Sequence, residues 1–275
     1  MRTVRFVTLL AVGPAWTAAA PAWASLDRRE CDPLCVQARG EDVGTALLVE
    51  FYKQLPEQRE GMDSEAYAAR LQAALARFQK RVAERYSEGT LQRLLDNPNS
   101  QTRRAAVLAV GLMGTMDSSP SVAARLHDDD PDVREKAGDA LWALWFRADS
   151  DENNRELQRL MRLKDSDKAI SGLDALIRRA PGFAEAYNQR AILYFRQKEY
   201  DKCANDCEKT LQLNPHHFGA QSGMARCFMR LRKPRAALKA FRRAYAINPN
   251  LDGVEDAIRD LEDALGEEGR TDDKK

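Results

Sequence analysis

Three prolines recur at intervals of 34 residues in the C-terminal part of the chain, at Pro181, Pro215 and Pro249. The residues before each proline repeat in the same register. Equivalent positions hold small or large side chains in these triplets: Ala169, Cys203 and Ala237; Leu173, Cys207 and Phe241; Leu160, Tyr194 and Phe228. A fixed period of about 20–50 residues is typical of stacked repeats. The pattern therefore predicts a solenoid, whose core is a continuous stripe.

Each period contains two amphipathic helical patterns, for example residues 184–196 and 200–213, followed by a proline. Each unit is predicted to be a helical hairpin whose apolar side needs a neighbour. After the last proline, apolar residues at helical spacing predict one capping helix: Val254, Ala257, Ile258, Leu261 and Leu265. The chain has no sustained alternating strand pattern. The predicted fold class is therefore all-α, a helical-hairpin solenoid.

Residues 184–215 resemble a tetratricopeptide repeat, and residues 218–249 resemble a second one. The family's alternation of aromatic and small residues before a closing proline is found at Tyr187, Ala191, Tyr194, Cys203, Cys207 and Pro215. The second unit has Gln221, Ala225, Phe228, Ala237, Phe241 and Pro249 at these positions. The preceding unit, from about residue 150 to 181, keeps Leu157, Leu160, Ala169, Leu173 and Pro181.

A shorter repeat lies upstream, where segments that start at Asn99 and Asp130 align at a spacing of 31 residues. The aligned pairs are Arg103 and Arg134, Ala106 and Ala137, and Val110 and Leu141. Both segments follow a loop of Asp, Asn and Pro that can cap a helix, and both resemble short HEAT-type repeats. Further upstream, a helix over 45–55 is predicted before a long amphipathic helix with Tyr67, Leu71, Leu75, Phe78, Val82 and Tyr86 on its apolar face.

The first 24 residues have the features of a cleaved secretory signal. Two arginines precede an apolar stretch that ends in Ala22-Trp23-Ala24, with small residues where a signal peptidase reads. We expect cleavage after Ala24 and a periplasmic or secreted protein. The alternative is an uncleaved membrane anchor, but two prolines and a short apolar stretch disfavour a spanning helix of about 20 residues. No stable membrane insertion is expected after cleavage.

The predicted organisation has six parts: a signal peptide at 1–24, a flexible segment at 25–40, a helical region at 41–95, HEAT-like repeats at 96–148, tetratricopeptide-like repeats with their capping helix at 150–265, and a disordered tail at 266–275. Loss of residues 1–24 removes two of the 43 basic side chains and none of the 42 acidic ones. The resulting balance argues against general nucleic-acid binding, which needs a concentrated basic face.

The five cysteines leave several pairings open. Cys31 and Cys35 lie in a proline-containing segment that can close a local disulfide. Cys203 and Cys207 lie one turn apart on a predicted helix, with Cβ atoms about 5–6 Å apart, farther than a disulfide prefers. They are interpreted as buried packing residues, although Cys227 can pair with either. A zinc site would need two converging cysteine pairs, so no metal or cofactor is predicted.

No catalytic residue is predicted, and the protein is interpreted as non-enzymatic. The histidines are His127, His216 and His217, of which the last two follow Asn214-Pro215 in a turn between repeats, where exposed polar residues are usual. No spacing supports a Ser-His-Asp arrangement. Trp142 and Trp145 stand three residues apart, just before the tetratricopeptide-like segment. They are predicted to pack at the junction between the two repeat arrays, with Trp145 partly buried.

The tetratricopeptide resemblance implies that the first helix of each hairpin lines a concave groove. The matching, predicted peptide-binding residues are Asn188, Ile192, Phe195, Arg196, Ser222, Arg226, Met229 and Arg230. Arg162, Arg196 and Arg230 recur at 34-residue steps, and such a row can clamp a carboxylate or an acidic peptide. The competing interpretation is that these arginines are solvated and favoured by the helix dipole.

The predicted function is an exported protein–protein interaction scaffold or assembly factor that binds a protein or peptide segment in the groove, with an acidic segment as one candidate. The alternative is an accessory or regulatory subunit of a cell-envelope enzyme. The lysine and asparagine set that chaperone-tail-binding members of the family use is absent, so that partner is not implied.

Overall fold

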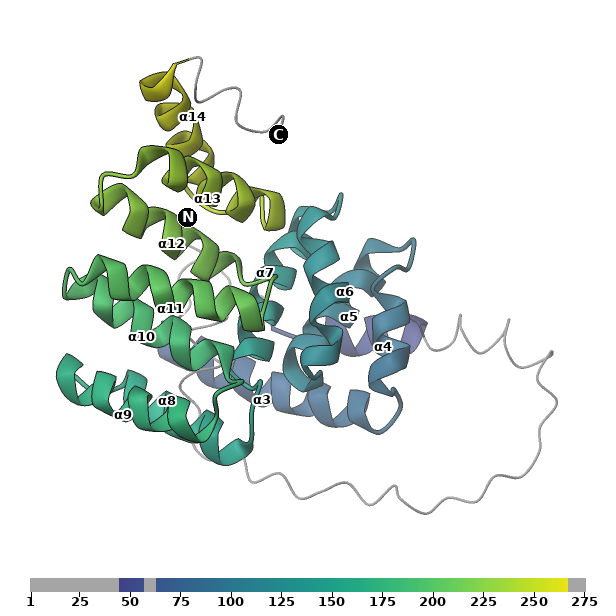
Figure 1. The fold of residues 1–275 in the computed structure, drawn as a ribbon. Coiled ribbons are helices and arrows are strands. Elements are labelled where there is room, and N and C mark those ends of the chain that lie inside the picture. Colours follow the sequence, from purple (N-terminus) through teal and green to yellow (C-terminus); the bar gives the residue numbers. More distant parts are fainter. Residues whose placement is uncertain (1–44, 57–62, 267–275) are drawn as a thin grey trace. The chain divides into compact units, whose positions relative to one another are not determined.

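The computed structural model describes residues 45–56 and 63–266 of the chain (Figure 1). Within these ranges the secondary structure consists of α-helices and two short 3-10 helices, and no strand occurs. The predicted all-α class is therefore confirmed. The predictions about the signal peptide, the Cys31–Cys35 loop and the tail after Gly266 lie outside the described residues. The chain divides between Met113 and Gly114 into two compact units.

The first unit contains a helix over residues 45–53, α3 (Ser64–Ala83), α4 (Glu88–Leu94) and α5 (Ser100–Met113). The carboxylate of Asp63 caps α3 by accepting a hydrogen bond from the amide of Ala66. The buried face of α3 carries Leu71, Ala74, Leu75, Phe78 and Val82, as its 3.6-residue period predicted. Tyr67 and Tyr86 are partly exposed at the ends of this face.

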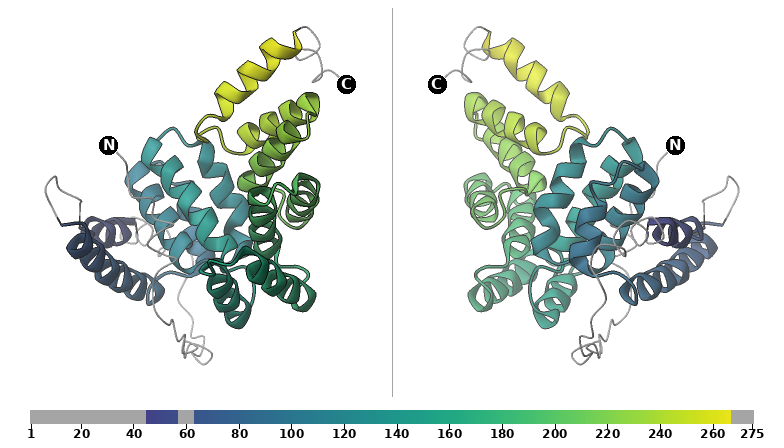
Figure 2. Two further views of the ribbon diagram at one scale, coloured as in Figure 1. Left: turned by 90° about the vertical axis from the view of Figure 1, so that its left-hand side faces the viewer. Right: turned by 90° about the vertical axis from the view of Figure 1, so that its right-hand side faces the viewer.

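The second unit begins with two short 3-10 helices, η1 (Met116–Ser118) and η2 (Arg125–His127), which flank α6 (Ser119–Ala124). Next comes α7 (Pro131–Trp145). Three helical hairpins follow: α8 (Asp151–Met161) with α9 (Ser166–Arg179), α10 (Ala184–Arg196) with α11 (Tyr200–Leu213), and α12 (Phe218–Arg230) with α13 (Pro234–Ile247). The hairpins stack in chain order, and α14 (Val254–Leu265) packs on α13 (Figures 1 and 2).

The two upstream repeats begin with the same local structure. Asp130 caps α7 by accepting hydrogen bonds from the amides of Asp132 and Val133, and Asn99 accepts the equivalent bonds at the start of α5. Arg134 donates to the carbonyls of Asp128 and Asp129 in the loop before α7. Arg103 does the same before α5, to Asn97 and Pro98. The sequence alignment at 31 residues therefore corresponds to a repeated capping loop.

Small residues lie where the hairpin helices pack most closely. Ala191, Ala225, Cys203 and Ala237 are buried at the positions that the 34-residue period assigned to small side chains. Larger neighbours fill the remaining space in three clusters along the stack, as expected for a core that runs as a stripe. Gln221, which replaces an aromatic residue of the repeat pattern, is also buried.

Two equivalent turn residues adopt left-handed backbone conformations. Lys198 lies in the turn between α10 and α11 with φ of 65°, and Arg232 occupies the same repeat position with φ of 56°. This conformation costs a residue with a Cβ roughly 1–2 kcal/mol, whereas glycine adopts it freely.

We therefore expect Lys198→Gly and Arg232→Gly each to stabilise the protein by up to about 1 kcal/mol, since the greater freedom of glycine in the unfolded chain offsets part of the gain. Urea unfolding of the two variants would measure this difference. Lys239→Gly, placed inside α13, is the control and should destabilise by about 1 kcal/mol. A loss of stability at both turn positions would contradict the expectation.

Candidate binding site in the repeat groove

The eight predicted groove residues divide into an accessible set and a buried set. Ile192, Arg196, Arg226, Met229 and Arg230 are exposed, and Phe195 is half-buried. Asn188 and Ser222 are only 3% and 7% exposed. These two lie in the first half of α10 and α12, whereas the other six lie in the second half. Only the second half of each helix therefore presents predicted groove residues to solvent.

Asn188 is held by a buried carboxylate that the sequence did not single out. Its amide nitrogen donates to Glu185 Oε1 at 3.0 Å, and Glu185 is fully buried near the start of α10. Gln189 donates to the same oxygen at 2.6 Å. The second oxygen, Oε2, lies 2.9 Å from His217 Nε2. A buried carboxylate needs such partners, since leaving it without donors would cost several kcal/mol.

His217 joins this carboxylate to the start of α12. The amide of Ala220 donates to Nδ1 of His217 at 3.0 Å, so Nε2 carries the hydrogen and donates to Glu185. The imidazole thus replaces the usual serine or aspartate as the N-cap of the helix. The expectation that His217 occupies an exposed turn was wrong, because the side chain is completely buried.

Two tryptophans of α7 cover the His217 side chain. The ring of Trp145 stacks on His217 with centroids 4.1 Å apart, and Trp142 meets the same ring edge-on at 5.3 Å. Phe218 lies against both tryptophans. Trp145 is only 1% exposed, which is more buried than the sequence predicted, and its indole N–H donates to Ser119.

Gly219 makes the approach of α7 possible. A Cβ added at this position would lie 2.6 Å from Cη2 of Trp142, so any side chain would displace the indole ring. The end of α7 therefore packs against the start of α12, where the concave side of the repeats begins. The chain itself fills the part of the groove next to His217, Phe218 and Gly219.

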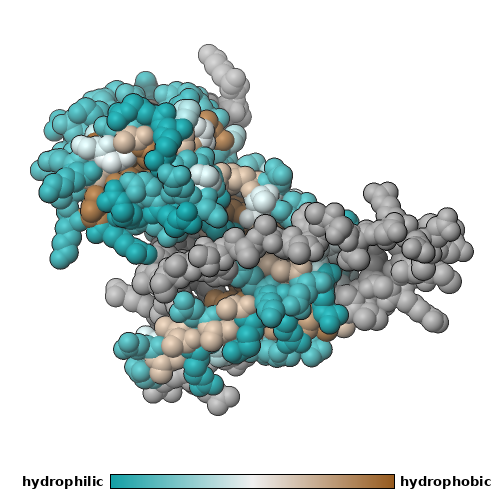
Figure 3. Space-filling view, turned by 90° about the horizontal axis from the view of Figure 1, so that it is seen from below, coloured by the Kyte–Doolittle hydropathy of each residue, from teal (hydrophilic) through white to brown (hydrophobic). Residues whose placement is uncertain are grey.

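The accessible part of the groove repeats one apolar and one basic side chain. Met161, Phe195 and Met229 are equivalent in the 34-residue register, and each is followed by an arginine: Arg162, Arg196 and Arg230. The exposed large hydrophobic residues of the described chain are Met161, Ile192 and Met229. Most of the remaining surface is hydrophilic, as the face drawn in Figure 3 illustrates. Met161 was not predicted, although its spacing from Phe195 signalled it.

The helices under this surface are tied together by ion pairs. Arg190 of α10 forms two hydrogen bonds of 2.7 Å to the carboxylate of Asp206 in α11 and one of 2.6 Å to Asp174 in α9. The hydrogen bonds to Asp206 are the main reason that the pKa of Arg190 lies above its ordinary value. This network fixes α10 between its neighbours with planar, charge-assisted contacts.

A disulfide adds a covalent link between the same repeats. Cys203 of α11 is bonded to Cys227 of α12, with Cα atoms 6.7 Å apart. The sequence left this pairing open but favoured packing roles for Cys203 and Cys207. Cys207 alone has that role, as a free thiol buried in the same cluster. Phe195 packs against this cluster, so the disulfide supports a groove residue from beneath.

Burial raises the pKa of the Cys207 thiol to about 12. Since the thiolate is the reactive form, we expect no alkylation of Cys207 in the native protein at about pH 8. Iodoacetamide treatment without reductant, followed by peptide mapping, would test this. Labelling in concentrated guanidinium is the positive control, and rapid native labelling would contradict the expectation.

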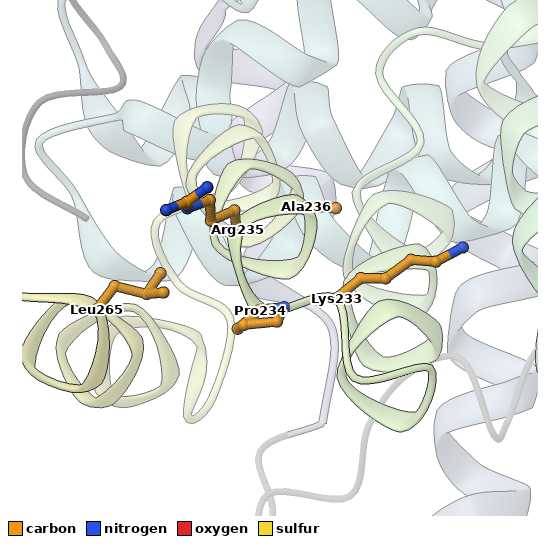
Figure 4. A pocket seen from close by; sticks show the side chains of 5 residues that line it. All are labelled: Lys233, Pro234, Arg235, Ala236 and Leu265. Carbon is orange, nitrogen blue, oxygen red and sulfur yellow. The ribbon is translucent and has the colours of Figure 1, made fainter. Parts of the chain in front are cut away.

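A second hollow lies between the start of α13 and the end of α14 (Figure 4). It has a volume of about 520 Å³ and is lined by Lys233, Pro234, Arg235, Ala236 and Leu265. Leu265 points toward Pro234 and Arg235, while Lys233 extends away from it. The lining contains no carboxylate, thiol or imidazole, so it offers neither ligands for a transition metal nor a catalytic group.

Metal ligands do not gather elsewhere in the described chain, where no group of three or more His, Cys, Asp or Glu side chains could hold an ion. No helix within residues 45–56 and 63–266 is long and apolar enough to cross a membrane.

The fold and the groove define a helical repeat protein of the interaction-module class. Residues 184–217 match the Tetratricopeptide repeat family, and residues 59–142 match HEAT repeats. The chain therefore carries tetratricopeptide repeats in its C-terminal part and HEAT repeats upstream, as the sequence patterns indicated.

Two curated relatives contain tetratricopeptide repeats. A TPR repeat-containing protein of Rhizobium etli is 32% identical over 126 residues, which cover 45% of this chain and 62% of the relative. Small glutamine-rich tetratricopeptide repeat-containing protein 2 of Saccharomyces cerevisiae is 25% identical over 226 residues, covering 80% of this chain and 60% of the relative. The chain thus spans about six tenths of the length of these relatives.

Solved structures of tetratricopeptide proteins resemble parts of the chain. The first TPR of Spaghetti bound to an HSP90 peptide is 23% identical, with a TM-score of 0.37, and covers 42% of this chain and 88% of that one. A thermophilic TPR protein of Thermus thermophilus is 19% identical, with a TM-score of 0.33, and covers 80% and 98% of the two chains.

Proposed function

We propose that the protein is an exported interaction scaffold whose tetratricopeptide groove binds an acidic segment of a partner protein. The carrying observation is the accessible half of the groove, where Arg196, Arg226 and Arg230 surround exposed apolar side chains. In the described part of the chain, none of these three arginines forms an ion pair. Exposed guanidinium groups in a row favour carboxylate-bearing ligands, which accept paired hydrogen bonds from them.

The proposal of a non-enzymatic role follows from the same surface. The buried Glu185 and His217 pair resembles an acid–base couple in composition, but both side chains are fully enclosed and already bonded to neighbours. A catalytic base must reach a substrate proton, which this pair does not. An accessory subunit of an envelope enzyme stays the alternative, since such a subunit would use the same groove.

Export is supported by the composition of residues 1–24 and by the Cys203–Cys227 disulfide. Disulfides persist mainly in oxidising compartments such as the periplasm. N-terminal sequencing of the protein from its native cell fractions would test this part. A mature chain that begins at residue 25 in the envelope or medium is the expected result, and an intact Met1 in the cytoplasm would reject it.

The triple variant Arg196→Ala, Arg226→Ala, Arg230→Ala tests the groove. Partner capture from an envelope extract should fall at least about tenfold, and the remaining binding should depend less on salt, because charge-assisted hydrogen bonds contribute about 1.5–3 kcal/mol each. The three side chains are exposed, so the melting temperature should not change.

A matched control removes three exposed cations from other helices of the same repeats: Arg178→Ala, Lys239→Ala and Arg243→Ala. This control should bind as the wild type does. If the two triple variants lose binding equally, the effect comes from net charge. If neither loses binding at low salt, the groove is not the binding surface.

A further inference from the structure

The accessible groove presents equivalent side chains on consecutive hairpins. We call Met161, Phe195 and Met229 the apolar ladder. Met161 and Met229 are 43% and 45% exposed, which is unusual for large apolar side chains in a stack whose other large residues are mostly buried. Phe195 is half-buried because its ring packs edge-on against Tyr200, with centroids 5.4 Å apart. The ladder is therefore a regular, solvent-facing feature.

The spacing of the ladder sets the spacing of a ligand. The helices α10 and α12 pack against each other, and packed helices have axes about 8–10 Å apart. An extended chain advances roughly 3.3 Å per residue. Successive rungs therefore match side chains that stand about three residues apart in an extended ligand. A bound helix would need a spacing of about seven residues to cover the same distance.

The charges beside the ladder determine what stands between those apolar side chains. Each rung is followed by an arginine, and Arg226 occupies the repeat position of Ile192, so the basic character increases from α10 to α12. In the stretch 63–266, no carboxylate pairs with Arg196, Arg226 or Arg230. Acidic ligand side chains would supply the missing partners.

The position of α7 limits the length of groove that a ligand can use. Trp142 and Trp145 already contact the start of α12, and Asn188 and Ser222 are buried. A ligand can therefore cross only the second halves of α8, α10 and α12. Three rungs at this spacing accommodate about seven extended residues.

We propose that the apolar ladder binds a short extended acidic segment in which apolar residues recur at every third position. This inference rests on the proposed function and specifies its ligand. The ladder supplies the register, and the arginines supply the preference for carboxylates. The same geometry disfavours ligands with apolar residues at alternate positions, because every second rung contact would be out of register.

Two labelled decapeptides of identical composition test the proposal by fluorescence anisotropy with the full-length oxidised protein. Both contain three leucines and seven aspartates, with the leucines three residues apart in one and two residues apart in the other. The three-residue peptide should bind roughly tenfold more tightly, since a misplaced leucine forfeits the burial of one apolar side chain. Met229→Ala should lower its affinity by a similar factor, and Lys239→Ala should not.

Each outcome separates the ladder from the groove. Equal affinities for the two peptides, both lost in the triple arginine variant, would overturn the ladder and leave the acidic-segment proposal intact. A preference for leucines seven residues apart in a longer helical peptide would also overturn it. If neither decapeptide binds at low salt, the ladder is wrong, and the partner-capture experiment then decides separately on the groove.

Discussion

Replacing Trp145 by alanine is expected to lower the free energy of unfolding by about 3–5 kcal/mol, the range for removal of a large buried aromatic side chain. Trp145 is among the largest fully buried residues of the described chain, and its ring stacks on His217 and contacts Phe218. The substitution removes these contacts together with the hydrogen bond to Ser119. Urea unfolding followed by circular dichroism would measure the loss.

Trp145→Phe is the matched control for this prediction. It keeps an aromatic ring beside His217 while it removes the indole N–H, so a smaller loss is expected. A loss below about 1 kcal/mol for Trp145→Ala would show that α7 does not depend on this cluster. The interpretation of a filled half-groove would then be wrong as well.

His217→Ala is expected to destabilise the protein by about 3 kcal/mol or more. The variant removes one donor from the fully buried Glu185 carboxylate, the N-cap acceptor of Ala220, and the ring on which Trp145 stacks. Loss of one partner from a buried ionic or polar pair is costly because the other group stays buried without full compensation. Thermal and urea unfolding of the variant would measure this effect.

A double-mutant cycle makes the prediction specific to the pair. Glu185→Gln, His217→Ala and the double variant should show a coupling energy of about 1–3 kcal/mol, since the two side chains are in direct contact. Additive losses would mean that the imidazole stabilises through stacking and capping alone. Neither substitution touches the accessible groove residues, so binding measured under folding conditions should be preserved.

Both predictions concern contacts that connect the HEAT-like helix α7 to the repeat groove. These contacts cover the start of α12 and leave the second halves of the groove helices for a ligand. Changes in the aromatic cluster would therefore alter the boundary of the accessible groove. The cluster is structural, and the arginines and the apolar ladder are where we place binding.

The sequence predicted the secondary structure of the repeats accurately because their signals are local. The bounds of α10 and α11 agree with the helical patterns at 184–196 and 200–213. The capping loops before α5 and α7 were visible because a cap involves residues two to four apart in the chain. Burial along α3 and at the small residues of the hairpins followed from periodicity for the same reason.

The candidate site was predicted only in part. Six of the eight groove residues are accessible, because the 34-residue register places equivalent side chains on the same face of each first helix. Met161 carried the same signal and was missed only because the degenerate first unit was not included in the groove. Their role in binding stays a prediction, whereas Asn188 and Ser222 show that a register gives the face of a helix and not its neighbours.

The sequence by itself determined the helices, their pairing into hairpins and the side of each hairpin that needs a partner, since these depend on residues close together in the chain. Only the tertiary structure decided that His217 is buried on Glu185, that Cys203 pairs with Cys227, and that α7 fills the start of the groove. Each of these contacts joins different helices, and α7 stands outside the 34-residue period. No local pattern encodes which non-repeating element packs against a repeat.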